Sequence, residues 1–307
     1  MKLRGHETFF VRKGWLSKGL KHIVKAPDVF VSKTDNPMDV LGIGANMVKS
    51  LRYWMQATGL TTEPKSGVRK QSLTDFGRLV YEHDRYIEEV GTLLFLHYKL
   101  ACNDRLATAW YFFFQEFGMK EFSKDDFVRS LNSYIVLNYT GAAPTERSMQ
   151  DDFNCLINTY VSRHRLSPGK ASPENNIDCP LGELGLIDIV SKEKKLYRKQ
   201  APSVKLFNAW LLLAMILEQQ QLDKDANADA TEIELQHLLT GKNGIGRVFN
   251  LDTLALVELL RLAEAKGLFK IVRTAGLDVI RLSRQYTVEE CLLHYYDSLK
   301  IDEERVL

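Results

Sequence analysis

The sequence predicts a mainly α-helical protein with a winged-helix module, a helix-turn-helix followed by a short β-hairpin wing, at each end of a helical middle region. Apolar residues recur at helical spacing along most of the chain, and near each end a glycine-rich turn separates two such segments. Short hairpin-like segments follow each pair. The 307 residues are 45% apolar and 26% charged, which excludes disordered and collagen-like chains.

The first module is predicted from local stop and start signals over residues 36–64. Asn36-Pro37 begins a short helix, residues 42–44 break it, and a longer helix over 45–58 ends at Gly59. The polar segment 63–72 has the size of a wing, and Thr74 or Asp75 is expected to cap the next helix.

The middle region is expected to be helical and aromatic. A core helix is predicted over 93–117, and two more helices over 123–138 and 145–161. This pair fits a second, degenerate helix-turn-helix or a helical packing domain equally well. A loop at 166–176, an apolar run at 185–190, a basic turn at 192–199 and a buried helix at 203–220 follow.

The C-terminal segment is predicted to be a second winged helix, with helices over 231–239 and 252–266 and strands over 268–272 and 279–282. Its long helix carries both charge signs, which favours a structural or partner-binding role over direct DNA contact. Because 222–230 is typical of an exposed linker, the expected domains are 1–90, 91–222 and 223–307.

Charge and helical geometry together predict DNA binding by the first module. Residues 1–85 contain 15 Lys and Arg against 8 Asp and Glu, whereas the whole chain has a net charge of only +2. One face of the 45–58 helix is expected to present amide, hydroxyl, cationic and aromatic groups suited to phosphate and base contacts. An ordinary solvated face is the alternative. The predicted DNA-binding residues are Arg12, Lys13, Asn46, Lys49, Ser50, Arg52, Tyr53, Gln56, Arg69 and Lys70.

Several classes of protein are excluded by missing patterns. The four cysteines, at 102, 155, 179 and 291, have no zinc-ligand spacing and are expected to be reduced thiols of a cytoplasmic protein. Neither apolar tract fits a bilayer span of roughly 20 residues, and the N-terminus lacks a secretory pattern. P-loop, nucleophile-elbow, HExxH and recognised nuclease motifs are absent.

Four stretches carry a family resemblance that covers nearly the whole chain. They are Gly5-His6-Glu7-Thr8-Phe9 with Arg12, Gly14 and Trp15; residues 41–54, LGIGANMVKSLRYW; Gly91-Thr92-Leu93-Leu94 before His97; and Cys179-Pro180-Leu181-Gly182-Glu183-Leu184. They resemble the SspB-like components of bacterial single-stranded DNA phosphorothioation and phage-defence systems, encoded beside sulfur-transfer enzymes that resemble phosphoadenosine-phosphosulfate reductase. The resemblance implies DNA binding and Mg²⁺-dependent DNA nicking. It also implies a cysteine desulfurase, an ATPase and an ATP-pyrophosphatase-like protein as partners.

Carboxylates near the basic module are the candidates for such chemistry, since Mg²⁺ prefers oxygen ligands. Asp84, Glu88 and Glu89 are the predicted metal ligands; on a helix Asp84 and Glu88 would face the same way, although a solvated acidic helix start is the plainer alternative. His6, Glu7 and Glu88 are the predicted catalytic residues, with His6 or Glu7 as general base or metal ligand. For His97, flanked by apolar residues, a hydrogen-bonded core role is expected.

Three functions remain open at this point. The first is a Mg²⁺-dependent nickase that opens the strand for sulfur insertion. The second is a non-enzymatic DNA adaptor that recruits the sulfur-transfer enzymes, and the third is a winged-helix repressor, which would be favoured by a dimer on a palindromic site. The chain is also compatible with an oligomer.

Overall fold

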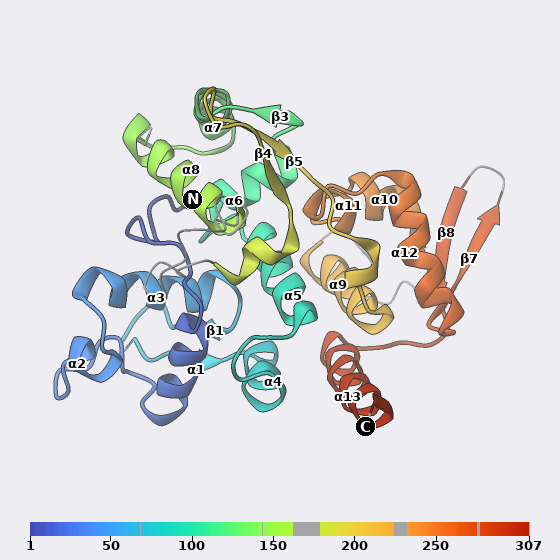
Figure 1. The fold of residues 1–307 in the computed structure, drawn as a ribbon, viewed down its shortest axis with the longest axis horizontal. Coiled ribbons are helices and arrows are strands. Elements are labelled where there is room, and N and C mark those ends of the chain that lie inside the picture. Colours follow the sequence, from blue (N-terminus) through green and yellow to red (C-terminus); the bar gives the residue numbers. More distant parts are fainter. Residues whose placement is uncertain (68, 143, 162–178, 224–231, 275–276, 307) are drawn as a thin grey trace. The chain divides into compact units, whose positions relative to one another are not determined.

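The computed structural model describes residues 1–67, 69–142, 144–161, 179–223, 232–274 and 277–306. The described chain is mainly helical, as predicted, with small antiparallel sheets, and it forms two compact units, Met1–Gln200 and Ala201–Leu307 (Figure 1). None of the described helices has the length and apolar content of a membrane span. No disulfide joins the four cysteines in the part of the chain that the structure describes.

The first unit begins with the helices of the predicted helix-turn-helix. Asn36 caps the shorter helix by accepting a hydrogen bond from the Met38 N–H at 3.1 Å, and Gly42, at φ 61°, makes the left-handed turn that ends it. Thr74 caps the fourth helix, as predicted, through the Gly77 N–H at 3.0 Å. The elements are α1 (Trp15–Lys25), α2 (Pro37–Leu41), α3 (Ala45–Ala57), β1 (Thr61–Thr62), β2 (Ser72–Leu73) and α4 (Asp75–His83). β1 and β2 pair antiparallel where the wing was predicted.

The middle of the first unit differs from the sequence prediction at one helix. The continuous helix expected over 93–117 is broken after Ala101, because Asn103 accepts the Leu106 N–H and donates to the Ala57 carbonyl, which turns the chain. The observed segments are α5 (Val90–Ala101), α6 (Thr108–Tyr111) and the π-helical η1 (Phe112–Glu116). The next two predicted helices are confirmed as α7 (Lys124–Asn138), with a Ser123–Asp126 capping box, and α8 (Glu146–Tyr160).

A three-stranded sheet closes the first unit. Its order is β3-β5-β4, with β3 (Glu121–Phe122), β4 (Ile187–Ser191) and β5 (Leu196–Lys199), and the short helix η4 (Pro180–Leu184) precedes β4. The predicted apolar run and basic turn at 185–199 are therefore a β-hairpin. Phe113, Phe122 and Phe127 are fully buried in edge-to-face and tilted ring contacts beside this sheet.

The second unit places helices around a three-stranded antiparallel sheet of order β6-β8-β7. The predicted long helix and hairpin are found, but residues 232–234, expected to be helical, form a strand that pairs with β8. The elements are η5 (Val204–Leu206), α9 (Ala209–Leu222), β6 (Glu232–Glu234), α10 (Leu235–Thr240), α11 (Ile245–Val248), α12 (Thr253–Ala265), β7 (Phe269–Thr274), β8 (Leu277–Leu282) and α13 (Val288–Val306).

The two units differ from the three predicted domains, and buried contacts explain why. The N-terminal segment bonds to the middle region, through the Lys2 N–H to Thr108 Oγ1 at 2.9 Å and the Arg4 N–H to Asp152 Oδ1 at 2.8 Å. Residues 1–90 therefore share one unit with the helices that follow. α9, which was predicted to end the middle domain, packs against α12 and α13. The predicted loop at 166–176 and most of the linker at 222–230 lie outside the described residues.

Candidate nucleic-acid interface

The exposed surface of α3 is confined to its N-terminal half. Asn46 and Lys49 are exposed, and Gly44 begins the helix without a side-chain cap. No heavy atom lies within 4 Å of the position that a Cβ of Gly44 would occupy, so the protein leaves space beside the start of α3. A helix N-terminus of this kind favours a phosphate group, and Lys49 adds a positive charge one turn further along.

Two predicted DNA-binding residues of α3, Ser50 and Tyr53, are not on this surface, and their prediction as exposed residues is wrong. Ser50 is fully buried and donates to the Phe9 carbonyl at 3.3 Å. Tyr53 is buried against Gly5, where an added Cβ would clash with the tyrosine ring. The N-terminal segment covers this side of α3, so neither side chain is available to DNA as placed.

Arg52 and Gln56 are partly exposed but are tied to the wing. Glu63 accepts two hydrogen bonds from the Arg52 guanidinium, at 2.8 and 2.6 Å, and a third from Gln56 at 3.4 Å. Gln71, on the other arm of the hairpin, donates to the Arg52 carbonyl at 3.1 Å. These contacts fix the wing against α3, and Glu63 offsets the charge of Arg52.

The wing and the N-terminal segment extend the positive surface. Arg69 and Lys70 are exposed on the wing. Burial lowers the pKa of Lys2 most, the positive charges of Arg52 and Arg69 lower it further, and the carboxylates of Glu63 and Glu7 act in the opposite direction. Lys2 also lies 5.1 Å above the Tyr53 ring.

Arg12 and Lys13, also predicted to bind DNA, lie just before α1. The Arg12 guanidinium lies 5.7 Å from the Phe9 ring and 5.3 Å from the Trp15 ring, and its buried Nε has no hydrogen-bond partner among the described residues. Lys13 is exposed. Ring stacking of this kind restrains an arginine side chain.

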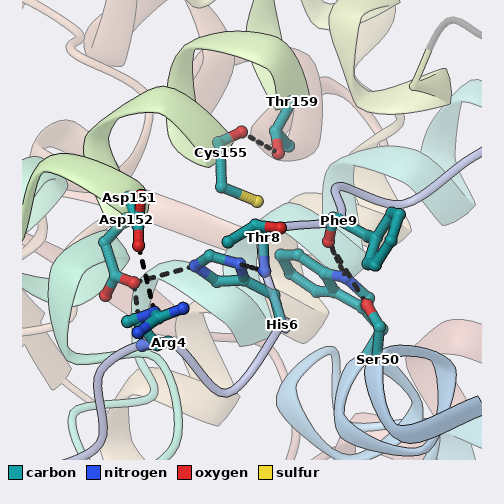
Figure 2. A network of polar contacts seen from close by, with 10 residues as sticks. Arg4, His6, Thr8, Phe9, Ser50, Asp151, Asp152, Cys155 and Thr159 are labelled. Atoms are coloured by element: carbon teal, nitrogen blue, oxygen red, sulfur yellow. Dashed lines mark hydrogen bonds and ion pairs between the residues drawn. The ribbon is translucent and has the colours of Figure 1, made fainter. Parts of the chain in front are cut away.

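The motif at residues 4–8 forms a strained loop. Arg4, Glu7 and Thr8 have φ values of 54°, 48° and 67°, in the left-handed region that non-glycine residues seldom adopt. Asp152 of α8 accepts the Arg4 N–H, and Asp151 pairs with the Arg4 side chain at 3.1 Å (Figure 2). The loop is therefore held by α8, and Glu7 remains partly exposed within it.

His6 is sealed inside this loop, which contradicts the expectation of an accessible general base or metal ligand. The side chain is fully buried, its Nδ1 accepts the Thr8 N–H at 3.0 Å, and its Nε2 lies 2.8 Å from Asp152 Oδ1 (Figure 2). Because Nδ1 accepts a hydrogen bond, the ring proton is on Nε2 and is donated to Asp152. The imidazole also stacks on Trp54, with ring centroids 6.1 Å apart.

The predicted metal ligands do not form a cluster. Asp84 ends α4 rather than continuing a helix toward Glu88, so the two do not share a helical face. Both Asp84 carboxylate oxygens accept backbone hydrogen bonds, from the Glu88 N–H at 2.9 Å and the Glu89 N–H at 3.2 Å. Glu88 is exposed and Glu89 is the N-cap residue of α5. Across the described residues, no group of three or more His, Cys, Asp or Glu is arranged to hold a metal ion.

His97 and the basic turn at 192–199 have structural contacts within the first unit. His97 is buried and its Nδ1 lies 2.8 Å from the Tyr160 hydroxyl, as expected of a core histidine. In the basic turn Arg198 pairs with Glu121 at 2.7 Å, and Lys199 donates to the Phe113 and Phe117 carbonyls. Burial lowers the pKa of Lys199 to about 7.

Sequence reasoning missed Asp152, Glu63 and Lys2. Asp152 lies beyond the first turn of α8, which begins at Glu146. Asp152 meets His6 across 146 positions of sequence, and no local spacing signals such a contact. The Arg52–Glu63 ion pair could have been predicted from the sequence, because Glu63 lies eleven residues after Arg52 at the start of the predicted wing.

The fold is that of a mainly helical protein with several small antiparallel sheets. The chain belongs to the DUF4007 family of proteins of unknown function, whose model matches residues 3–296. Its fold is that of SspB, which confirms the resemblance predicted from sequence. The magnesium ion-bound SspB crystal structure gives a TM-score of 0.80 at 24% identity, covering 100% of this chain and 97% of that one. A second SspB crystal structure gives 0.78 at 24% identity, covering 99% and 96%. No curated protein matches the chain.

Proposed function

We propose that this chain is a DNA-binding component of a DNA phosphorothioation and anti-phage defence system, acting on DNA in the cytoplasm through a winged helix formed by α1–α4, β1 and β2. The second unit, in which α10–α12 precede the β7–β8 hairpin and α13 follows it, is proposed as a second winged-helix domain. The partners proposed are a cysteine desulfurase, an ATPase and an ATP-pyrophosphatase-like protein. The full-length similarity to the fold of SspB supports this assignment.

The observation that carries the proposal is the exposed start of α3 beside the wing. Asn46 and Lys49 lie at an uncapped helix N-terminus, and Arg69 and Lys70 are exposed on the adjoining hairpin. Such cations neutralise backbone phosphates, while an exposed amide is suited to a base edge. The expected DNA affinity therefore falls steeply as salt is raised.

We further propose that the protein nicks DNA with Mg²⁺, as the family resemblance implies. The magnesium ion-bound SspB structure supports a role for the ion. The predicted ligands fit poorly, since Asp84 is committed to backbone N–H groups and only Glu88 remains freely exposed. Glu7, partly exposed in the strained loop, is the other carboxylate available to the reaction.

Plasmid nicking tests the enzymatic part of the proposal. Purified protein is incubated with supercoiled plasmid in Mg²⁺ or EDTA, alongside Glu7→Gln, Glu88→Gln and the exposed control Glu193→Gln. We expect open-circle product only with Mg²⁺, in the wild type and the control, and its loss in Glu7→Gln or Glu88→Gln. Product that persists in both would show that neither carboxylate is required.

A second candidate is a non-enzymatic adaptor that binds DNA and recruits the sulfur-transfer enzymes. The burial of His6 and the commitment of Asp84 favour it, because two of the predicted chemical groups are closed to DNA. Tight, salt-dependent DNA binding without nicking, even when the three proposed partners are added, would establish the adaptor in place of the nickase.

A further inference from the structure

The second unit contains a broad groove that the proposed DNA contacts do not use. It has a volume of about 960 Å³ and lies between α10, α12 and the β7–β8 hairpin. Its apolar wall includes Leu235, Leu239 and Val257. Leu254 lies at the groove and is 81% exposed, which is unusual for a leucine on a helix with an otherwise buried core face.

The charges around this groove argue against nucleic acid as its occupant. Glu234, Glu258 and Asp278 line it together with Arg261 and Arg273, so acidic groups outnumber basic ones. Arg273 lies 3.7 Å from Asp278, whose carboxylate offsets the positive charge of the arginine at the groove. A phosphate backbone would meet repulsion there, whereas a protein surface carrying both signs would not.

One side of α12 forms a stripe of apolar and charged residues that no described residue of the second unit covers. The exposed residues of this side are Leu254, Glu258, Arg261, Leu262 and Ala265, and Val257 beside them is partly exposed. At 3.6 residues per turn the six positions occupy an arc of about 140°. Among the described residues, neither Glu258 nor Arg261 has an ion-pair partner. Glu264, by contrast, accepts the Ile271 N–H at 2.7 Å and belongs to the internal packing.

This stripe, the α12 stripe, is complementary to itself. When two copies run antiparallel, the register that places Glu258 opposite Arg261 of the second copy also places Val257 opposite Leu262 and Leu254 opposite Ala265. Each pairing occurs twice about a two-fold axis, as an isologous interface requires. Both charges are then paired, and each exposed leucine meets an apolar residue.

From this complementarity we infer that the α12 stripe and its groove form a homodimer interface, with a second copy of this chain as the occupant. α12 alone is about 20 Å long, which is short for a stable interface. The groove adds to this surface, because Val257, which the register pairs with Leu262 of the second copy, also lines the groove. We expect a dimer that dissociates at micromolar concentrations.

Charge exchange tests this interface without relying on a destabilised variant. Glu258→Arg and Arg261→Glu each place like charges opposite one another in a homodimer, and each is expected to raise the dimer dissociation constant at least about tenfold. Mixing the two variants restores opposite charges at both pairings, and so does the double variant. Glu193→Lys, on an exposed turn of the first unit, is the matched control.

Sedimentation equilibrium of the full chain gives the readout, with circular dichroism to confirm folding of each variant. Dimerisation of the wild type and control, loss in both single variants and recovery in the mixture would support the interface. A monomeric wild type at about 100 µM, or a dimer unaffected by either variant, would overturn it. Loss without recovery in the mixture would overturn the register, and a DNA-affinity defect in Arg261→Glu with unchanged association would assign the groove to nucleic acid instead.

Discussion

At the scale of single residues, Asp152 organises the N-terminal motif. Its carboxylate is buried and accepts both the Arg4 N–H and the His6 Nε2–H, each at 2.8 Å. The neighbouring Asp151 is partly exposed and pairs only with the exposed Arg4 side chain. The two adjacent carboxylates therefore contribute differently to the free energy of unfolding. Removing a buried partner leaves polar groups without a hydrogen bond, which costs far more than losing a surface ion pair.

This contrast predicts unequal effects of two adjacent substitutions. Asp152→Ala leaves His6 and the Arg4 N–H without acceptors inside the protein and is expected to lower the free energy of unfolding by about 2–4 kcal/mol. Asp151→Ala, the matched control, should cost less than about 1 kcal/mol. Chemical denaturation of the two variants and the wild type measures both values. Equal losses would contradict a structural role for the His6–Asp152 contact.

Lys199 gives a pH-dependent prediction. Burial lowers its pKa to about 7, while the unfolded chain retains the ordinary value of 10.5. Between these values the unfolded state holds the extra proton, so stability rises with pH, by up to about 1.4 kcal/mol per pH unit. Below pH 7 both states are protonated and this contribution is constant.

Thermal unfolding of the wild type and Lys199→Met between pH 6.5 and 9.5 checks this expectation. The melting temperature of the wild type relative to that of the variant should rise across the interval, because methionine has no proton to release. A constant difference between the two proteins would show that Lys199 does not titrate there.

At the scale of elements, two cations of α3, Lys49 and Arg52, have different roles. Lys49 projects freely, whereas the Arg52 guanidinium is bonded twice to Glu63 and so joins α3 to the wing. A charge reversal at either position removes a cation from the proposed DNA surface. Only the reversal of Arg52 also breaks an internal contact.

Lys49→Glu is therefore expected to weaken DNA binding about tenfold, lower the salt dependence by about one phosphate contact and leave stability within about 0.5 kcal/mol. Arg52→Glu should weaken binding and also destabilise the protein, because two carboxylates then face one another. Fluorescence anisotropy at several salt concentrations, paired with denaturation, separates the effects. Arg129→Glu on α7 is the control, and unchanged affinity in Lys49→Glu would exclude the start of α3 as the DNA surface.

How far each element could be predicted depends on the range of the interactions that form it. The α2–α3 turn and the caps at Asn36 and Thr74 were predictable because each signal acts within a few residues. The burial of Ser50 and Tyr53 was not, since their cover comes from residues 5–9, about forty positions away. Helical periodicity places a residue on a face but does not say what covers that face.

The predicted cluster of metal ligands is not found among the described residues, for a related reason. An acidic run suggests a metal site only if its carboxylates converge, and the end of α4 at Asp84 separates them. Asp84 instead satisfies two backbone N–H groups, a common role for aspartate beside a helix start. The strand at residues 232–234 was missed because it pairs with β8, far along the chain.

At the scale of the whole molecule, the two structural units carry net charges of opposite sign. Residues 1–200 contain 29 Lys and Arg against 23 Asp and Glu, whereas residues 201–307 contain 12 against 16. The first unit carries the proposed DNA surface, and the α12 stripe of the second is suited to a second copy of the chain. Together the two proposals imply a division of tasks between the units, in which the first would contact nucleic acid and the second would bring two chains together.

Separate expression of residues 1–200 and 201–307 tests this division. Each unit has its own core, so both fragments are expected to fold, which circular dichroism and cooperative unfolding verify. The first fragment should keep a salt-dependent affinity for DNA within about tenfold of the full chain, because it retains the phosphate contacts. The second should show no DNA binding at physiological salt, since its net negative charge opposes a polyanion. DNA binding by the folded second fragment, with none by the folded first, would reverse the assignment and place the nucleic-acid surface in the C-terminal unit.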